Sequence, residues 1–95
     1  MIGKYVIVRS DKAGVFAGTL EEKNKNEVVL SNCRRIWRWE GACSLSQMAV
    51  DGTKKPKECN FSMTVDEIVI LDVIEIIPCT KEAETSIKGV GVWKI

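Results

Sequence analysis

Turn-forming residues interrupt the chain at short intervals, and this spacing restricts its first third to short extended segments. Residues 5–9 form a β-branched run that ends at residues 10–14, a cluster of turn formers. The extended pattern resumes over residues 15–23, and residues 24–26 close it with side chains that tolerate left-handed backbone angles. The sequence therefore predicts a strand, a turn, a second strand and a hairpin that leads into a third strand.

The third strand begins at residues 27–30, and the extended pattern can continue to Trp39. A run of that length exceeds a usual strand, so Ser31 and Asn32 are predicted to form a bulge or a bend. Further along, residues 61–65 alternate between apolar and polar types, and residues 68–71 and 73–77 hold the densest apolar content of the chain. These later segments are predicted to be central strands.

Two helices are expected. Ser44 and Gln47 fit a capping box, with the Ser44 hydroxyl on the amide of Gln47 and the Gln47 side chain returning to Ser44, so a two-turn helix is predicted at about 44–51. Thr80 can cap a final helix that Gly89 ends. The fold class predicted from these patterns is α+β, one domain over residues 1–95, with mainly antiparallel strands, a short helix after strand three and a C-terminal helix.

Charge and composition exclude several classes of function. Lysine and arginine number 14 against 13 aspartates and glutamates, a formal net charge of +1, so any cationic site must be local. The chain has no histidine, the side chain whose charge normally changes near neutral pH, which removes most catalytic triads and metal sites. We therefore expect no enzymatic activity, no metal and no cofactor.

The four cysteines are not arranged as zinc ligands. Cys33, Cys43, Cys59 and Cys79 contain no Cys-x-x-Cys pair, and the N-terminal residues carry no export signal, so the thiols are expected to be reduced in the cytosol. No apolar run approaches ~18 residues, so no membrane span is expected.

The segment from Arg34 to Trp39 places three cations and two of the three tryptophans in six residues. If it is extended, alternation puts Arg35, Trp37 and Trp39 on one face and Arg34, Ile36 and Arg38 on the other. Arginine offers a planar fork to phosphate, and tryptophan offers a stacking surface. The same residues could instead be core anchors and solvated cations, and the sequence does not show which face meets solvent.

A nucleotide-type ligand would suit both residue types. Its phosphates would contact Arg34, Arg35 and Arg38, and its base would stack on Trp37 or Trp39. Backbone donors at the helix start, from Ser44 to Gln47, and Arg9 beside the first turn are further candidates. Tryptophan and arginine are also enriched in protein interfaces, so a host protein is an equal alternative to a nucleotide.

Residues 18–32, with Gly18, Leu20 and the apolar run 28–30, resemble the first motif of Sm-like small β-barrels. The resemblance implies a strongly bent five-stranded sheet, or small barrel, that assembles into rings which often bind RNA or nucleotides.

Nearly the whole chain is similar to a family of uncharacterised small phage and prophage proteins, most clearly at residues 6–9, 34–42, 44–47 and 73–80. The resemblance implies a phage or prophage origin more than an activity, and small phage proteins of this size are often accessory factors that counter host defence in the host cell cytosol. We expect a non-enzymatic homo-oligomer that sequesters a nucleotide-type ligand; the alternatives are an inhibitor of a host protein and an RNA-binding ring.

Overall fold

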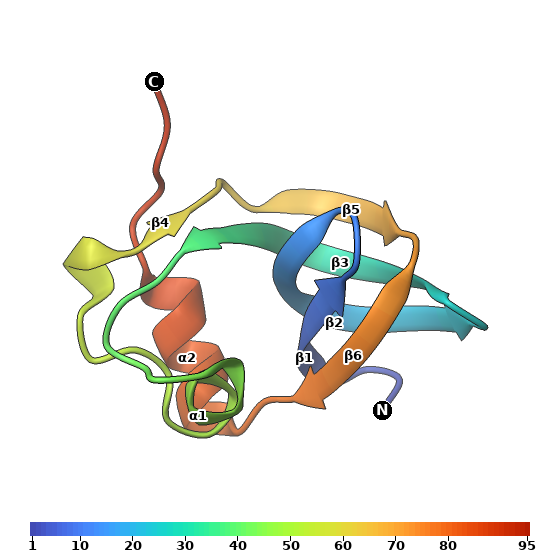
Figure 1. Ribbon diagram of the computed structural model, residues 1–95, viewed down its shortest axis with the longest axis horizontal. Helices are drawn as coiled ribbons and strands as arrows, with labels where there is room; N and C mark the ends of the chain where they lie inside the picture. The colour runs from blue at the N-terminus through green and yellow to red at the C-terminus, as the bar shows by residue number, and fades with distance from the viewer.

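The computed structural model describes all 95 residues, and Figure 1 shows two helices at one end of a curved sheet. A long hairpin extends to the other end, and the C-terminal segment projects from the body. The elements are β1 (Tyr5–Ser10), β2 (Gly14–Asn24), β3 (Glu27–Arg38), α1 (Leu45–Asp51), the 3-10 turn η1 (Pro56–Glu58), β4 (Asn60–Phe61), β5 (Val65–Ile70), β6 (Val73–Pro78) and α2 (Lys81–Gly89).

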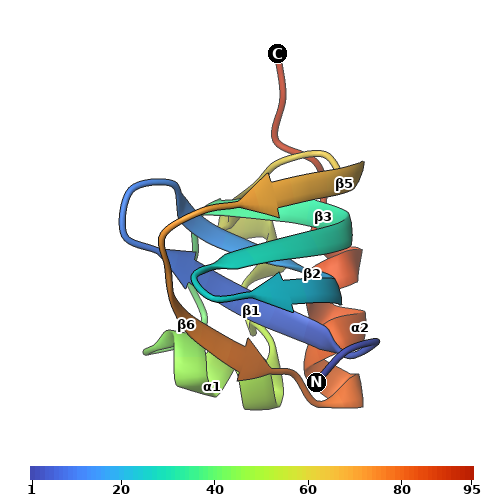
Figure 2. The ribbon, with the colours of Figure 1, turned by 90° about the vertical axis from the view of Figure 1, so that its right-hand side faces the viewer.

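The strands form one antiparallel sheet in the order β4-β3-β2-β1-β6, with β5 paired to the first half of β3. Figure 2 shows β5, β3, β2, β1 and β6 stacked in this order from top to bottom. The predicted α+β class, with a strongly bent antiparallel sheet, a helix after strand three and a C-terminal helix, is confirmed. The sheet has a sixth strand because the two residues of β4 pair with the end of β3.

The pairing of the long strands β2 and β3 shifts at two places, between Ala17 and Thr19 and between Leu20 and Glu22, and the first shift bends β3. Asn32 has a φ of 47°, and the pairing between the two strands shifts by one residue at this point, which confirms the predicted bulge. On β2, a Cβ atom at position 18 would lie 3.0 Å from the carbonyl oxygen of Ser31 and 3.1 Å from the Cα of Cys33. Gly18 therefore lets the two backbones approach where the bulge bends β3.

Two hydrophobic clusters stabilise the fold, one on each face of the sheet. The first is enclosed by strands alone, on the face around which the sheet curls, and contains Val8, Phe16 and Leu30 among its buried residues. The second joins β1 and β3 to the helices through residues such as Ile7 and Ile36. Strand β1 is buried on both faces because consecutive residues alternate between the two clusters.

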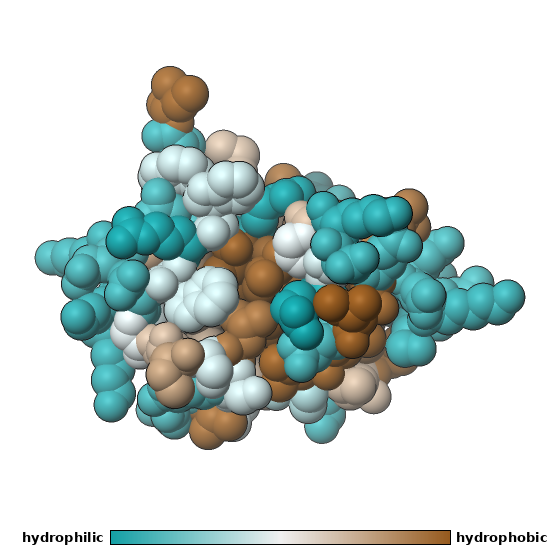
Figure 3. Space-filling view, in the orientation of Figure 1, coloured by the Kyte–Doolittle hydropathy of each residue, from teal (hydrophilic) through white to brown (hydrophobic).

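The prediction that residues 61–65, 68–71 and 73–77 form central strands is wrong. Each of β5 and β6 pairs with one neighbour only, so they are the two edges of the sheet. Val69, Leu71 and Ile74 are each more than half exposed, although the segment has the densest apolar content of the chain. In Figure 3, hydrophilic residues cover the tip of the β2–β3 hairpin, whereas hydrophobic residues reach the surface over β6.

The helix caps follow the sequence closely. Ser44 Oγ accepts a hydrogen bond from the Gln47 amide at 3.1 Å, and Thr80 Oγ1 accepts one from the Ala83 amide at 3.0 Å. The Gln47 side chain, however, accepts from the amide of Cys43 and not from that of Ser44, so this half of the predicted capping box lies one residue earlier. Neither helix has the length and apolar character that a membrane span requires.

Arg34 joins β3 to the C-terminal end of α2. Its side chain is 3% exposed, and its guanidinium donates hydrogen bonds to four backbone carbonyls, those of Ser62 (2.9 Å), Ile87 (3.0 Å), Val90 (2.7 Å) and Gly91 (3.3 Å). A cation at this position also interacts favourably with the negative end of the helix dipole. Burial lowers the pKa of the Arg34 guanidinium, which remains protonated because arginine titrates far above neutral pH.

We predict that Arg34→Met lowers the free energy of unfolding by about 3 kcal/mol or more, because the buried carbonyls of α2 lose a charged donor. Urea unfolding followed by circular dichroism measures the change. The matched control is Arg38→Met on the same strand, whose exposed guanidinium has one ion pair, and it should change stability by less than about 1 kcal/mol. Equal urea midpoints for the two variants would show that the hydrogen bonds of Arg34 do not stabilise the fold.

The four thiols are free and differ in accessibility. Cys43 is exposed, Cys33 and Cys59 are buried, and Cys79 is half-buried. Burial raises the pKa of Cys33 to about 12 and that of Cys79 to about 11. These two groups are therefore almost entirely protonated at neutral pH, and the thiolate is the reactive form.

We predict that Ellman's reagent modifies one thiol rapidly at pH 8 and that Cys43→Ser removes this fast phase. The reaction of Cys79 should rise about tenfold for each pH unit up to pH 11, because its thiolate fraction rises by that factor. Unfolding in urea should release all four thiols. A fast phase that survives in the Cys43→Ser variant would show that another cysteine is accessible.

Candidate functional site

Two tryptophans form an exposed aromatic surface at the end of the sheet near the helices. The ring centroids of Trp37 and Trp93 lie 6.4 Å apart with an angle of 17° between the ring planes, so the indoles are stacked. Nevertheless, Trp37 is 64% exposed and Trp93 54% exposed. A large aromatic side chain left in solvent is costly and is typical of binding surfaces. We name this pair the Trp37–Trp93 platform.

The backbone fixes the two rings from segments that are far apart in sequence. Trp37 lies at the end of β3, where Ile36 is paired with Phe61 of β4. The residues after α2 then run beside β4, with Val92 next to Phe61 in a parallel bridge and the Trp93 amide donating to the Phe61 carbonyl at 2.9 Å. The platform is thus carried by three adjacent extended segments.

Cations and an open depression adjoin the platform. Arg38 follows Trp37 and makes one ion pair, with Glu40 at 3.6 Å, while both side chains remain largely exposed. Trp93 and Lys57 line the same surface depression of about 630 Å³, together with Asn60, which pairs with Arg38 across the strands. The depression therefore brings together Trp93, the exposed cation Lys57 and the Asn60 amide, and the exposed Arg38 is the strand partner of Asn60.

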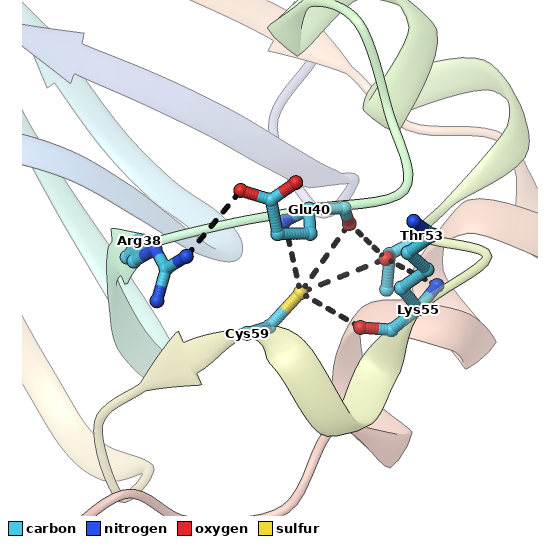
Figure 4. A network of polar contacts seen from close by, with 5 residues as sticks. All are labelled: Arg38, Glu40, Thr53, Lys55 and Cys59. Atoms are coloured by element: carbon cyan, nitrogen blue, oxygen red, sulfur yellow. Dashed lines mark hydrogen bonds and ion pairs between the residues drawn. The ribbon is translucent and has the colours of Figure 1, made fainter.

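The loop that follows β3 is fastened next to this depression by a buried thiol (Figure 4). Cys59 Sγ accepts from the Glu40 amide, and its single S–H is shared between the carbonyls of Glu40 and Lys55, each contact being 3.5 Å long. Thr53 Oγ1 donates to the Glu40 carbonyl at 2.5 Å and lies 3.6 Å from the same sulfur. This network fixes the position of Glu40 and so of the carboxylate that competes for Arg38.

The remaining arginines of the predicted site are distributed over different parts of the molecule. Arg34 is committed to the α2 carbonyls and has no exposed face for phosphate. Arg9 lies on β1 and pairs with Glu75 of β6 at 3.1 Å. Arg35 is half-buried, with its guanidinium carbon 4.6 Å from the centre of the Phe16 ring on β2.

The other predicted residues have structural roles. Trp39 lies beyond the end of β3 and packs against the cluster under the helices, so it does not share the exposed face of Trp37. Ser44 and Gln47 cap the short helix α1, and the Gln47 amide is already bound by the Ser44 hydroxyl. Of the eight predicted residues the structure therefore places only Trp37 in the platform, and Arg38 follows it on β3 as the strand partner of Asn60.

Sequence reasoning missed Trp93, Lys57 and Asn60. The sequence does hold a signal for Trp93, because Val92-Trp93 is an apolar pair at the end of the chain, which favours a tail that docks on the core or on a neighbour. Its partner could not be derived, since the tail reaches Trp37 only through the two-residue strand β4. Lys57 and Asn60 lie in a polar stretch that resembles an ordinary solvated loop.

The structure contains no cluster of potential metal ligands. No three carboxylate, cysteine or histidine side chains lie together as metal ligands. The chemistry available at the platform is stacking, ion pairing and hydrogen bonding.

Comparisons with known proteins place the chain in one family. Neither curated proteins nor solved structures gave a match. The family model described as "Domain of unknown function (DUF6948)" matches residues 3–87, and this range runs from the residues before β1 into α2. The chain therefore belongs to the DUF6948 family of uncharacterised domains.

Proposed function

We propose that this protein is a non-enzymatic binding protein that takes up a nucleotide-type ligand at the Trp37–Trp93 platform. The base stacks on an exposed indole face, and Arg38 and Lys57 pair with the phosphate. The observation that supports the proposal best is the pair of stacked indoles that stays more than half exposed, with Trp93 lining a depression that also contains Lys57. Stacking on an aromatic side chain stabilises a bound base by about 1–3 kcal/mol.

Sequestration needs more than one copy of the chain. The depression beside Trp93 is open, so a nucleotide bound to one copy would keep one side in water. A second copy placed over the platform would enclose the ligand and strengthen its ion pairs by excluding water. We therefore propose a homo-oligomer as the form that withholds the ligand.

The biological setting is proposed from the resemblance to small phage proteins. A cytosolic protein of this kind would withhold a nucleotide signal from a host defence system during infection. The proposal keeps Arg38 and Trp37 from the sequence analysis, adds Trp93 and Lys57, and assigns Arg34 to the fold.

We predict that at least one nucleotide from a panel of cyclic and linear compounds raises the melting temperature and quenches tryptophan fluorescence. Calorimetric titration of that nucleotide should show a loss of about 5- to 150-fold in affinity for Trp37→Ala, because one stacking face is removed. Arg38→Ala should lose about fivefold or more. No response from any nucleotide in the panel would remove the hypothesis.

The matched control for Arg38→Ala is Arg9→Ala. Both arginines are exposed and both have one ion pair with a glutamate, but Arg9 lies on β1. Arg9→Ala should bind the nucleotide as the unchanged protein does. Native mass spectrometry of the protein as purified would report the copy number and any retained small molecule together.

A protein partner is the second candidate, and the open shape of the depression favours it. Trp and Arg are the residue types that dominate the energy of protein interfaces. A host protein would then be masked by the platform without any nucleotide. An Sm-like ring that binds RNA is a third form of the proposal, in which successive bases would stack along neighbouring copies.

Salt dependence separates these candidates. Two phosphate contacts per copy, from Arg38 and Lys57, predict about a sevenfold fall in affinity for a single-stranded oligonucleotide between ~50 and ~200 mM salt. A protein partner held by buried tryptophans should lose less than about twofold in affinity over the same range of salt concentration. Fluorescence anisotropy at several salt concentrations measures the slope for each partner.

A further inference from the structure

A second groove, of about 360 Å³, lies beside the turn between β1 and β2. It shares no residue with the Trp37–Trp93 platform or the depression beside it. One wall consists of consecutive residues at the end of the edge strand β5, including Ile68 and Ile70. Phe16 and Ile70 are buried beneath the groove, Ala13, Val69 and Leu71 supply accessible apolar lining, and Lys12 and Arg35 add two cations.

Arg35 is held in this groove by contacts that leave its charge unpaired. It lies opposite Phe16 in the pairing of β2 and β3, and its guanidinium carbon is 4.6 Å from the centre of the Phe16 ring. Its Nη1 donates a hydrogen bond to the Ala13 carbonyl at 2.8 Å. None of the four ion pairs of the protein includes Arg35, and no hydrogen bond uses its Nε or Nη2.

The unused donors are the ones that recognise a carboxylate. The N–H groups of Nε and Nη2 lie parallel on one edge of a guanidinium, and this edge matches the two oxygens of a carboxylate. The Phe16 ring and the Ala13 carbonyl already fix the plane of the Arg35 side chain, so little rotational freedom would be lost on binding.

The other polar groups of the lining leave this cation available. Lys12 makes no ion pair, and Asp72, the one acidic residue of the lining, makes none either. Two cations against one carboxylate favour an anionic guest. The Ser10 hydroxyl is already committed, because it donates to the Leu71 carbonyl at 2.7 Å and accepts from the Ala13 amide at 3.1 Å.

We propose that this groove binds a small carboxylate with an apolar body, of the medium-chain fatty acid type. The carboxylate pairs with the Nε and Nη2 edge of Arg35, and the hydrocarbon lies on the accessible apolar residues of the lining, the half-buried Ile68 and the exposed Val69 and Leu71. A bare anion would leave the apolar walls in water, and a neutral hydrocarbon would leave the guanidinium without a partner. Both parts of the ligand are therefore needed for full affinity.

The test is a titration of the ¹⁵N-labelled full chain with sodium octanoate, followed by nuclear magnetic resonance. Octanoate should saturate at millimolar concentration and shift the Arg35 Nε–H signal together with the amide signals of Ala13, Phe16, Ile68 and Ile70. Octanol and inorganic phosphate are the two partial ligands, and each should bind at least about tenfold more weakly than octanoate.

Variants on one strand make the result specific. Arg35→Gln removes the paired N–H donors and should weaken octanoate binding at least about tenfold. Arg35→Lys keeps the charge without these paired donors, so its affinity for octanoate should lie between those of the unchanged protein and Arg35→Gln. Arg38→Gln, the control at the platform, should bind octanoate as the unchanged protein does. Undiminished binding by Arg35→Gln, shifts that never saturate, or phosphate binding as tight as that of octanoate would each overturn the proposal.

Discussion

The hydrogen bonds of Arg34 join three parts of the molecule that are remote in sequence. The Arg34 guanidinium, which comes from β3, donates hydrogen bonds to the carbonyls of Ile87 and Val90 at the end of α2. It also donates to the carbonyl of Gly91 in the C-terminal segment and to that of Ser62 after β4. The guanidinium also lies over the ring of Phe61, with its carbon 5.3 Å from the ring centre. Because the C-terminal segment carries Trp93, this buried cation positions half of the aromatic platform without touching it.

Neighbouring arginines on β3 show how burial determines what the same side chain can do. Arg34 is enclosed and all its bonds go to the backbone, so it serves the fold. Arg35, on the opposite face, keeps one edge of its guanidinium free beside an apolar groove. Arg38, where the strand ends, is open to water and is balanced by Glu40. Sequence adjacency alone would have assigned one role to all three.

Much of the fold could be predicted because local signals agreed with it. The hairpin at Lys25, the bulge at Asn32 and the caps at Ser44 and Thr80 all depend on residues close in sequence. The placement of β5 and β6 failed because apolar content was interpreted as burial, and a sheet edge can expose apolar side chains as well.

The candidate site was harder to derive. Alternation along β3 correctly separated Arg34 and Ile36 from Arg35 and Trp37, but the choice of the buried face depends on where α2 docks. Trp39 could not be placed by alternation, because the strand ends at Arg38 and the periodicity ends with it. Trp93 reached the platform through a contact that no local pattern encodes.

The extra residue at Asn32 gives β3 a change of parity. Before it, the even-numbered residues Val28 and Leu30 face the cluster enclosed by the strands; after it, the odd-numbered Cys33 does so, and the even-numbered Ile36 turns to the helices. A single-residue insertion or deletion in this strand would therefore change which of its side chains are buried. Loss of one residue at the bend would exchange inside for outside in everything downstream, whereas loss of two would preserve the sidedness of the strand.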